Sequence, residues 1–142
     1  IVGEVRDREA LPLLLTLSSG VKGFTTIHAG SARQALTRLR FVCQLADTSN
    51  ELPMSALNTL VSEAIDVVVY CVRTPDGPRV TEVAGVEDLV GTSDSTRFTV
   101  TDVFHRPRRD SDLCWTGDLP SRLARALEAV DIDLRQLLEG LR

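Results

Sequence analysis

The sequence has few of the residues on which metal centres and disulfide frameworks depend. Among its 142 residues only two are histidine and three are cysteine, and no two cysteines form a C-x-x-C pair. We therefore expect Cys43, Cys71 and Cys114 to be buried, reduced thiols of a cytosolic protein. No apolar run approaches the roughly 20 residues of a membrane span, and no signal-peptide pattern opens the chain. The net charge is −4, which gives no reason to expect a nucleic-acid partner.

The chain also lacks the loop that cradles phosphates in many ATP-hydrolysing folds. No G-x-x-x-x-G-K-[ST] motif occurs, and Lys22, the only lysine, lies in Val-Lys-Gly-Phe, which cannot replace it. There is no G-x-S-x-G elbow for Ser-His-Asp hydrolysis, and His28 and His105 are too few for a hydrolytic metal centre. We therefore expect the main phosphate-binding loop to lie outside this chain.

The hydrophobic pattern predicts alternating strands and helices. The expected strands are residues 1–5, 24–28, 67–72, 79–86 and 98–104; the expected helices are residues 9–17, 31–46 and 53–64, with two short helices after Asp118 and Asp133. Residues 47–51 and 88–96 are predicted loops, and residues 74–78 a hairpin turn. The continuous β-branched run at 67–72 is typical of a strand buried on both faces. This order predicts an α/β sheet whose far edge turns antiparallel.

Two polar side chains follow predicted strands. Glu4 ends the first strand, and His28 ends the second beside a helix that Ser31 opens. In an open parallel sheet, ligands bind beyond the carboxyl ends of the strands. A carboxylate, an imidazole and free helix N–H groups there could hold a metal-bound phosphate. The residues alone leave two alternatives open, a surface glutamate and a histidine that is bonded to a carbonyl.

Two further groups of residues have a chemical and a structural interpretation. Thr25 and Thr26 could add hydroxyl groups to the site, although threonine in a strand usually reflects β-propensity. The segment 106–109, Arg-Pro-Arg-Arg, is expected to be a solvated loop, and the alternative is a docking patch for an acidic partner.

Together these segments resemble the secretion-system ATPases of the type II/type IV superfamily, and within it the assembly motors of Flp-type (tight-adherence) pili. Residues 1–6, Ile-Val-Gly-Glu-Val-Arg, match the variant Walker B strand of that family. Residues 17–20 and 25–31 match its histidine box, and the segments 35–39, 64–69 and 79–83 follow in the family's order.

The resemblance implies a partial RecA-like P-loop NTPase core, from the Walker B strand onward, with an antiparallel edge hairpin and short C-terminal helices. Residues 1–142 would be the C-terminal half of the ATPase domain. Within it, 1–72 would form the Walker B and histidine-box core, 73–105 the edge hairpin and strand, and 106–142 the helical tail. The family further implies a homo-hexamer that binds Mg²⁺ and ATP. It would work in the cytoplasm at the inner face of the membrane, on inner-membrane platform proteins that assemble pili or secrete proteins.

The resemblance also assigns roles by position. Glu4 matches the Walker B carboxylate, which holds Mg²⁺ through a water, and His28 matches the histidine-box residue near the γ-phosphate. The candidates for nucleotide or subunit-interface contacts are Arg6, Thr25, Thr26 and Arg38. Because the family's Walker A loop and Asp box would precede Ile1, we expect the fragment alone to be inactive. The alternative is a non-catalytic remnant that docks onto other ATPase subunits.

Overall fold

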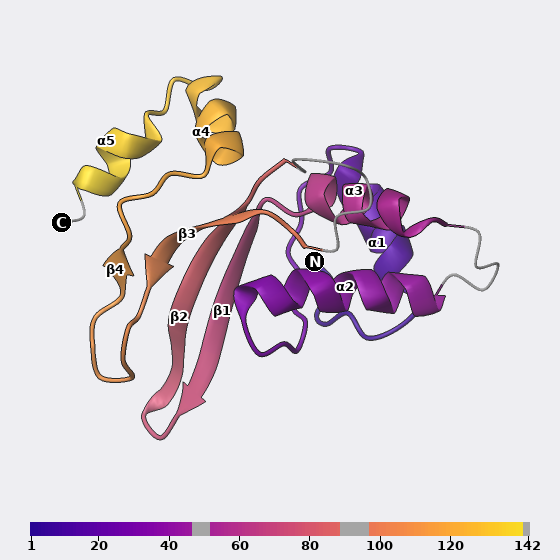
Figure 1. Ribbon diagram of the computed structural model, residues 1–142, viewed down its shortest axis with the longest axis horizontal. Coiled ribbons are helices and arrows are strands. Elements are labelled where there is room, and N and C mark those ends of the chain that lie inside the picture. The colour runs from indigo at the N-terminus through magenta and orange to yellow at the C-terminus, as the bar shows by residue number, and fades with distance from the viewer. Residues whose placement is uncertain (47–51, 89–96, 141–142) are drawn as a thin grey trace. The chain divides into compact units, whose positions relative to one another are not determined.

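The computed structural model describes residues 1–46, 52–88 and 97–140. The chain divides into two compact units (Figure 1). The helical unit comprises Ile1–Ile65 with Asp88–Thr99, and the sheet unit comprises Asp66–Glu87 with Val100–Arg142. The predicted loop 47–51, and all of the predicted loop 88–96 except residue 88, lie outside the described residues.

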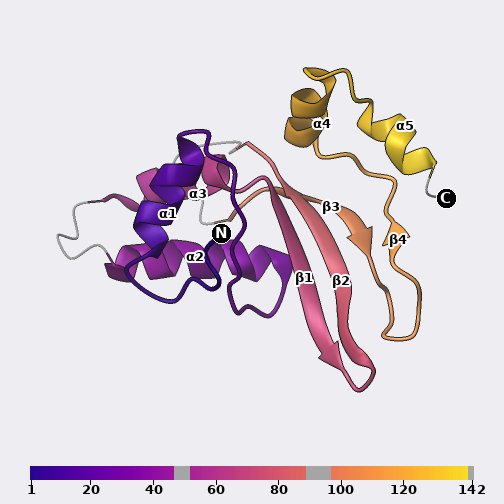
Figure 2. The ribbon, with the colours of Figure 1, turned by 180° about the vertical axis from the view of Figure 1, so that it is seen from behind.

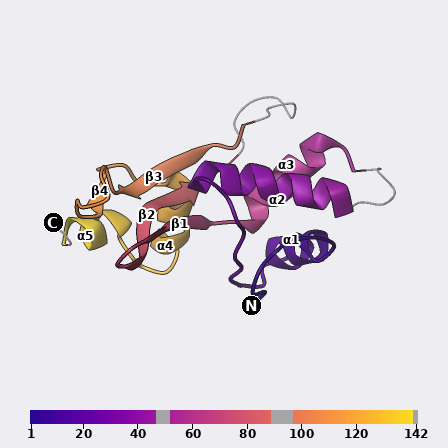
Figure 3. The same cartoon turned by 90° about the horizontal axis from the view of Figure 1, so that it is seen from below.

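Three helices form most of the helical unit (Figure 3): α1 (Ala10–Ser18), α2 (Ala32–Ala46) and α3 (Met54–Ala64). Each of the three confirms a predicted helix. The predictions rested on apolar residues three and four positions apart, which a helix brings to one face, toward the core. On α2 the buried apolar residues are Ala32, Ala35, Leu36, Leu39 and Cys43; on α3 they are Leu57, Val61 and Ala64. The Ser31 hydroxyl accepts from the Gln34 N–H at 3.1 Å, as the predicted cap requires.

The two short segments that carry Glu4 and His28 lie parallel to each other. Val2 and Thr25 form a single parallel bridge. Two backbone hydrogen bonds support the pairing, from the Val2 N–H to the Phe24 carbonyl at 3.1 Å and from the Val5 N–H to the Thr26 carbonyl at 2.8 Å. The parallel direction agrees with the prediction, but the prediction of full strands at residues 1–5 and 24–28 was wrong. No further ladder extends this pairing within the described part of the chain, so the segments remain an isolated bridge.

The sheet unit contains a four-stranded antiparallel sheet in the order β1-β2-β3-β4 (Figure 2). Its strands are β1 (Val67–Thr74), β2 (Gly77–Val86), β3 (Val100–His105) and β4 (Cys114–Trp115). The predicted hairpin is confirmed; Gly77 at its turn has φ of 113°, a left-handed conformation that glycine adopts freely. The α/β class is confirmed, whereas the parallel RecA-like core stays a prediction, since all pairings of this sheet are antiparallel.

Strand β1 corrects the prediction of a strand buried on both faces. Its exposure alternates, and Val67 and Val69 are 39% and 53% exposed. The β-branched run therefore reflects a preference for the pleated backbone rather than burial. The prediction of three buried thiols is wrong in the same way. Cys43 is buried on α2, but Cys71 on the open face of β1 and Cys114 on the short strand β4 are exposed.

The C-terminal tail forms two helices, α4 (Ser121–Glu128) and α5 (Leu134–Glu139). Leu134 and Leu138 of α5 form a buried cluster with Val103 of β3, and apolar residues of α4, among them Leu123 and Leu127, pack against it. Asp133 caps α5 by accepting from the Gln136 N–H at 3.1 Å. Helix α4 has Pro120 at its N-cap, without a side-chain cap of its own. Both predicted short helices are thus confirmed.

The N-terminus of α4 is capped from the end of β2. The Glu87 carboxylate accepts from the backbone N–H groups of Ser121, at 2.9 Å, and Arg122, at 3.1 Å. It also accepts from the Thr101 hydroxyl at 2.7 Å. A residue outside the helix therefore satisfies the donors that a helix N-terminus leaves open.

The loop after β3 is ordered by one of the arginines that were expected to be solvated. Arg106 is part-buried; its Nε donates to the Val80 carbonyl at 2.9 Å and its guanidinium also donates to the Ser111 carbonyl. Arg108 and Arg109 are exposed, as expected. The prediction was wrong for Arg106 because its partners are backbone carbonyls that the local sequence does not reveal.

In the described ranges, no helix is both long and apolar enough to cross a membrane.

Candidate functional site

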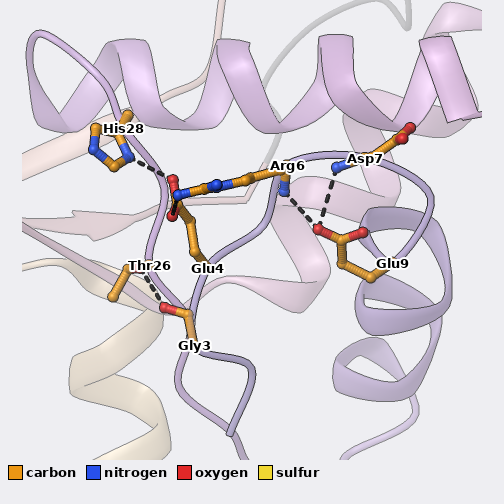
Figure 4. Close-up of polar contacts among 7 residues, drawn as sticks. All are labelled: Gly3, Glu4, Arg6, Asp7, Glu9, Thr26 and His28. Carbon is orange, nitrogen blue, oxygen red and sulfur yellow. Dashed lines mark hydrogen bonds and ion pairs between the residues drawn. The ribbon is translucent and has the colours of Figure 1, made fainter.

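The parallel bridge brings the two predicted site residues together. His28 Nδ1 lies 2.5 Å from Glu4 Oε1 (Figure 4). The Thr26 hydroxyl donates to the Gly3 carbonyl at 2.5 Å, which fastens the two segments beside the pair. Because a carboxylate oxygen can only accept, Nδ1 of His28 carries the hydrogen. The second ring nitrogen, Nε2, remains available for a ligand.

Arg6 engages the other oxygen of the same carboxylate. Its guanidinium donates to Glu4 Oε2, so both oxygens of Glu4 have a donor. The Glu4 side chain is only 23% exposed, whereas those of Arg6 and His28 are 74% and 80% exposed. The carboxylate is thus partly covered by two groups that solvent, or a ligand, can reach.

These contacts favour the ionised form of Glu4. The hydrogen bond from Arg6 lowers the pKa of Glu4, desolvation opposes this effect, and the hydrogen bond from His28 adds to the lowering. In return, the hydrogen bond to Glu4 raises the pKa of Arg6. Glu4 is therefore an ionised carboxylate at neutral pH, as a residue that orients water or a cation must be.

Glu9 is a member of this cluster that the sequence did not reveal. Its Oε1 accepts from the backbone N–H groups of Arg6, at 2.6 Å, and Asp7, at 3.2 Å (Figure 4). Hydrogen bonds from backbone N–H groups, with that of Arg6 the largest, lower the pKa of Glu9. The only available signal was an acidic residue at the start of a helix, which usually indicates an interaction with the helix dipole.

The remaining predicted candidates differ in their surroundings. The Thr26 hydroxyl is bonded to Gly3, and the Thr25 hydroxyl oxygen is buried without a hydrogen-bond partner in the described part of the chain. Arg38 is exposed on α2, and no hydrogen bond or ion pair among the described residues joins it to Glu4 or His28. Of the predicted candidates, the cluster therefore contains Glu4, Arg6 and His28, and the nucleotide or interface roles of all the candidates stay predictions.

The donors fit a metal that arrives with its own ligands better than a resident metal. Among the described residues, no group of three or more His, Cys, Asp or Glu side chains could hold an ion. Glu4 supplies the carboxylate that lies against His28, while the Glu9 carboxylate is engaged with the backbone N–H groups of Arg6 and Asp7. Mg²⁺ commonly keeps several waters and takes one or two carboxylates together with the phosphates of a substrate. A contact between Glu4 and Mg²⁺ through water, with the nucleotide supplying phosphate oxygens, is consistent with this donor set.

Comparison with known proteins gives matches to secretion machinery. Residues 1–111 match the family described as "Type II/IV secretion system protein". The chain is 40% identical over 88 residues to the probable conjugal transfer protein TrbB of Sinorhizobium fredii, covering 61% of this chain and 25% of that protein. It is 39% identical over 74 residues to the type IV secretion system protein PtlH of Bordetella pertussis, covering 51% and 22%.

The chain is also similar to a solved structure in both sequence and fold. That structure is the VirB11 ATPase of the Brucella suis type IV secretion system, in complex with sulphate, with a TM-score of 0.51 and 29% identity. The match covers 57% of this chain and 25% of that one. The chain thus spans about a quarter of the length of the relatives that it matches.

Proposed function

Because this chain belongs to the type II/IV secretion system protein family, we propose that it is part of an ATPase that powers protein secretion or pilus assembly. The family predicted from the sequence is confirmed. The finer assignment to Flp-type pilus motors stays a prediction, since the relatives compared are named for conjugal transfer and type IV secretion.

The observation that carries this proposal is the contact between Glu4 and His28. It joins the residues that match the Walker B carboxylate and the histidine box, 24 positions apart, at 2.5 Å. This contact favours a shared site over a surface glutamate and an unrelated structural histidine. The two side chains meet where the parallel segments end, which is the usual place for a ligand in open α/β folds.

In the proposed reaction, Glu4 would orient the water that attacks the γ-phosphate of ATP, or would hold a water of the Mg²⁺ that ATP brings. Arg6 and His28 keep the Glu4 carboxylate ionised and oriented. His28 holds its Nδ1 hydrogen toward Glu4, so Nε2 could donate to a phosphate oxygen when the ring also carries a hydrogen there. The imidazole can then respond to the loss of phosphate charge after hydrolysis.

The rest of the proposed machine follows from the family. The substrate Mg-ATP would be bound by a phosphate-binding loop in the part of the relatives' length that this chain does not span. We further propose a homo-hexamer that acts on inner-membrane platform proteins from the cytoplasmic side. A non-catalytic subunit that docks onto active ATPase subunits is the alternative.

Replacing Glu4 in the full-length natural protein that carries this chain distinguishes the two functions. Glu4→Gln keeps the side-chain shape and removes its charge. We expect ATP turnover to fall roughly 100-fold or more, as for loss of one acid–base or electrostatic group, while nucleotide binding persists. Asp7→Asn is the matched control, because Asp7 is an exposed neighbouring carboxylate. We expect this variant to hydrolyse ATP at the wild-type rate. Wild-type turnover by Glu4→Gln would exclude the catalytic role.

A further inference from the structure

We propose that Glu9 is a positioning residue for Glu4 and that it acts through Arg6. Its effect on hydrolysis rests on the proposed function of Glu4, but the chain of contacts does not. The three residues form a relay: the Glu9 carboxylate holds the Arg6 backbone, and the Arg6 guanidinium holds the Glu4 carboxylate.

The first link is the hydrogen bonding of the Glu9 carboxylate to the backbone that precedes α1. One oxygen, Oε1, accepts from two consecutive N–H groups, those of Arg6 at 2.6 Å and Asp7 at 3.2 Å. Hydrogen bonds to an ionised acceptor are among the stronger ones in proteins. Two of them at a single oxygen fix the direction in which the chain leaves residue 6.

Glu9 can serve as an anchor because α1 is fixed in the core of the helical unit. Ala10 and Leu14 on that helix are fully buried. The turn before it is closed by the Ala10 N–H, which donates to the Asp7 carbonyl at 3.1 Å. A carboxylate at the first turn of a packed helix is held more firmly than one on a free loop, which suits it to positioning another residue.

The second link is the ion pair of Arg6 with Glu4. The Val5 N–H, which donates to the Thr26 carbonyl at 2.8 Å, fixes the residue before it, and Glu9 fixes the backbone of Arg6. The Arg6 side chain is 74% exposed and contacts Glu4. An exposed ion pair must offset the loss of side-chain entropy in arginine, and most such pairs contribute little. A fixed backbone at residue 6 reduces that loss, so the pair between Arg6 and Glu4 is pre-organised.

An ordinary acidic N-terminal residue would serve its own helix instead. Glu9 lies at the N-cap of α1, yet its side chain makes no hydrogen bond to the first-turn N–H groups of α1. The carboxylate accepts instead from residues 6 and 7, which precede the helix. Its hydrogen bonds are therefore directed to the segment that carries Glu4.

Charge and position predict opposite effects for Glu9, which makes the proposal testable. Glu9 is a second negative charge near Arg6 and attracts it. If charge alone mattered, removing Glu9 would leave Arg6 more strongly paired with Glu4. If Glu9 positions Arg6, removing it weakens the same pair.

The experiment uses the 142-residue chain and NMR of its arginine guanidinium groups, at mildly acidic pH and low temperature. A guanidinium that a carboxylate holds rotates slowly about its Nε–Cζ bond and gives separate Nη signals. We expect separate signals for Arg6 in the wild type and their loss in Glu4→Gln. Exposed Arg38 provides an internal reference for a freely rotating group.

Variants of Glu9 then decide the proposal. Glu9→Ala should lose the separate Arg6 signals as Glu4→Gln does, whereas Glu9→Gln should keep them, since its amide oxygen can accept from both N–H groups. Asp7→Asn removes a neighbouring charge and should also keep them. If Glu9→Ala unfolds the chain, Glu9→Asp replaces it, because the shorter side chain keeps the charge but withdraws the oxygen. Separate Arg6 signals in Glu9→Ala, or in Glu9→Asp when it replaces that variant, would overturn the proposal.

Hydrolysis by the full-length protein separates this proposal from the function itself. We expect Glu9→Ala to lower kcat roughly 10-fold, with KM for ATP unchanged, as loss of an outer-shell partner does, and Glu9→Gln to recover most of it. If Glu4→Gln hydrolyses ATP normally, the proposed function fails. The positioning of Arg6 by Glu9 is then still decided by the NMR signals, which involve no nucleotide.

Discussion

Replacing Gly85 by alanine is the sharpest test of how the tail packs on the sheet. Gly85 lies in β2, and a Cβ atom added to it would lie 2.4 Å from Cβ and 2.7 Å from Cγ of Pro120. Both residues are buried, and the proline ring is rigid, so neither can give way easily. Ordinary carbon contacts lie at about 3.5–4.0 Å, so relief requires a shift of roughly 1 Å between β2 and the start of α4.

The expected cost follows from that distance. Overpacking in a well-packed core costs about 1–3 kcal/mol. Alanine returns about 0.4–1 kcal/mol by restricting the unfolded chain. We therefore expect Gly85→Ala to lower the free energy of unfolding by about 1–2 kcal/mol.

The assay is urea unfolding followed by the fluorescence of Trp115, the only tryptophan, which lies in β4 of the same unit. Gly140→Ala is the matched control, because its Cβ would meet atoms no closer than 3.6 Å; it should change stability by less than about 0.5 kcal/mol. In the double variant Gly85→Ala/Pro120→Gly, the two effects should couple favourably by at least about 0.5 kcal/mol. Wild-type stability of Gly85→Ala, or additive effects in the double variant, would refute the packing argument.

Three further outcomes are expected. Cys71 and Cys114 should react rapidly with a thiol reagent, and Cys43 only after unfolding, because burial raises its pKa to about 11 and leaves almost no thiolate; rapid labelling of three thiols in the native chain would contradict this. The lowered pKa of Glu4 means that its contacts stabilise the fold fully above the ordinary value of 4.5 and lose that effect as the pH falls below it. Melting temperatures of the wild type and Glu4→Gln should therefore differ at neutral pH and converge in acid, and a gap that persists in acid would argue against this origin. Finally, Glu87→Ala should lower the free energy of unfolding by about 1–3 kcal/mol, since it leaves helix donors without their acceptor; Glu87→Gln, measured by the same urea titration, should lose less.

The parts of the fold that the sequence predicted are those set by local patterns. The faces of α2 and α3 are determined by residues three and four positions apart, and the hairpin by a turn of a few residues. The meeting of Glu4 and His28 was also predictable, because parallel segments end at the same edge of a sheet. In each case the information lies within a short stretch or in one general rule of topology.

The features that the sequence did not reveal depend on contacts between distant residues. The exposure of β1 depends on what covers its face, and a β-branched run suits either case. The burial of Arg106 depends on the carbonyl of Val80, 26 positions away. Glu9 was missed for a different reason: its partners are near in sequence, but they are backbone groups, which no pattern of side chains marks.

The cap that Glu87 places on α4 has a consequence for the order of folding. A helix of eight residues is too short to be stable alone, and its N-terminal donors depend on a carboxylate 34 positions earlier in the chain. We therefore expect α4 to form only after β2 is in place, with mutations in α4 changing the unfolding rate more than the folding rate. Since β2 precedes α4 in the chain, β2 leaves the ribosome first. The residue that caps α4 is therefore synthesised before the helix that depends on it.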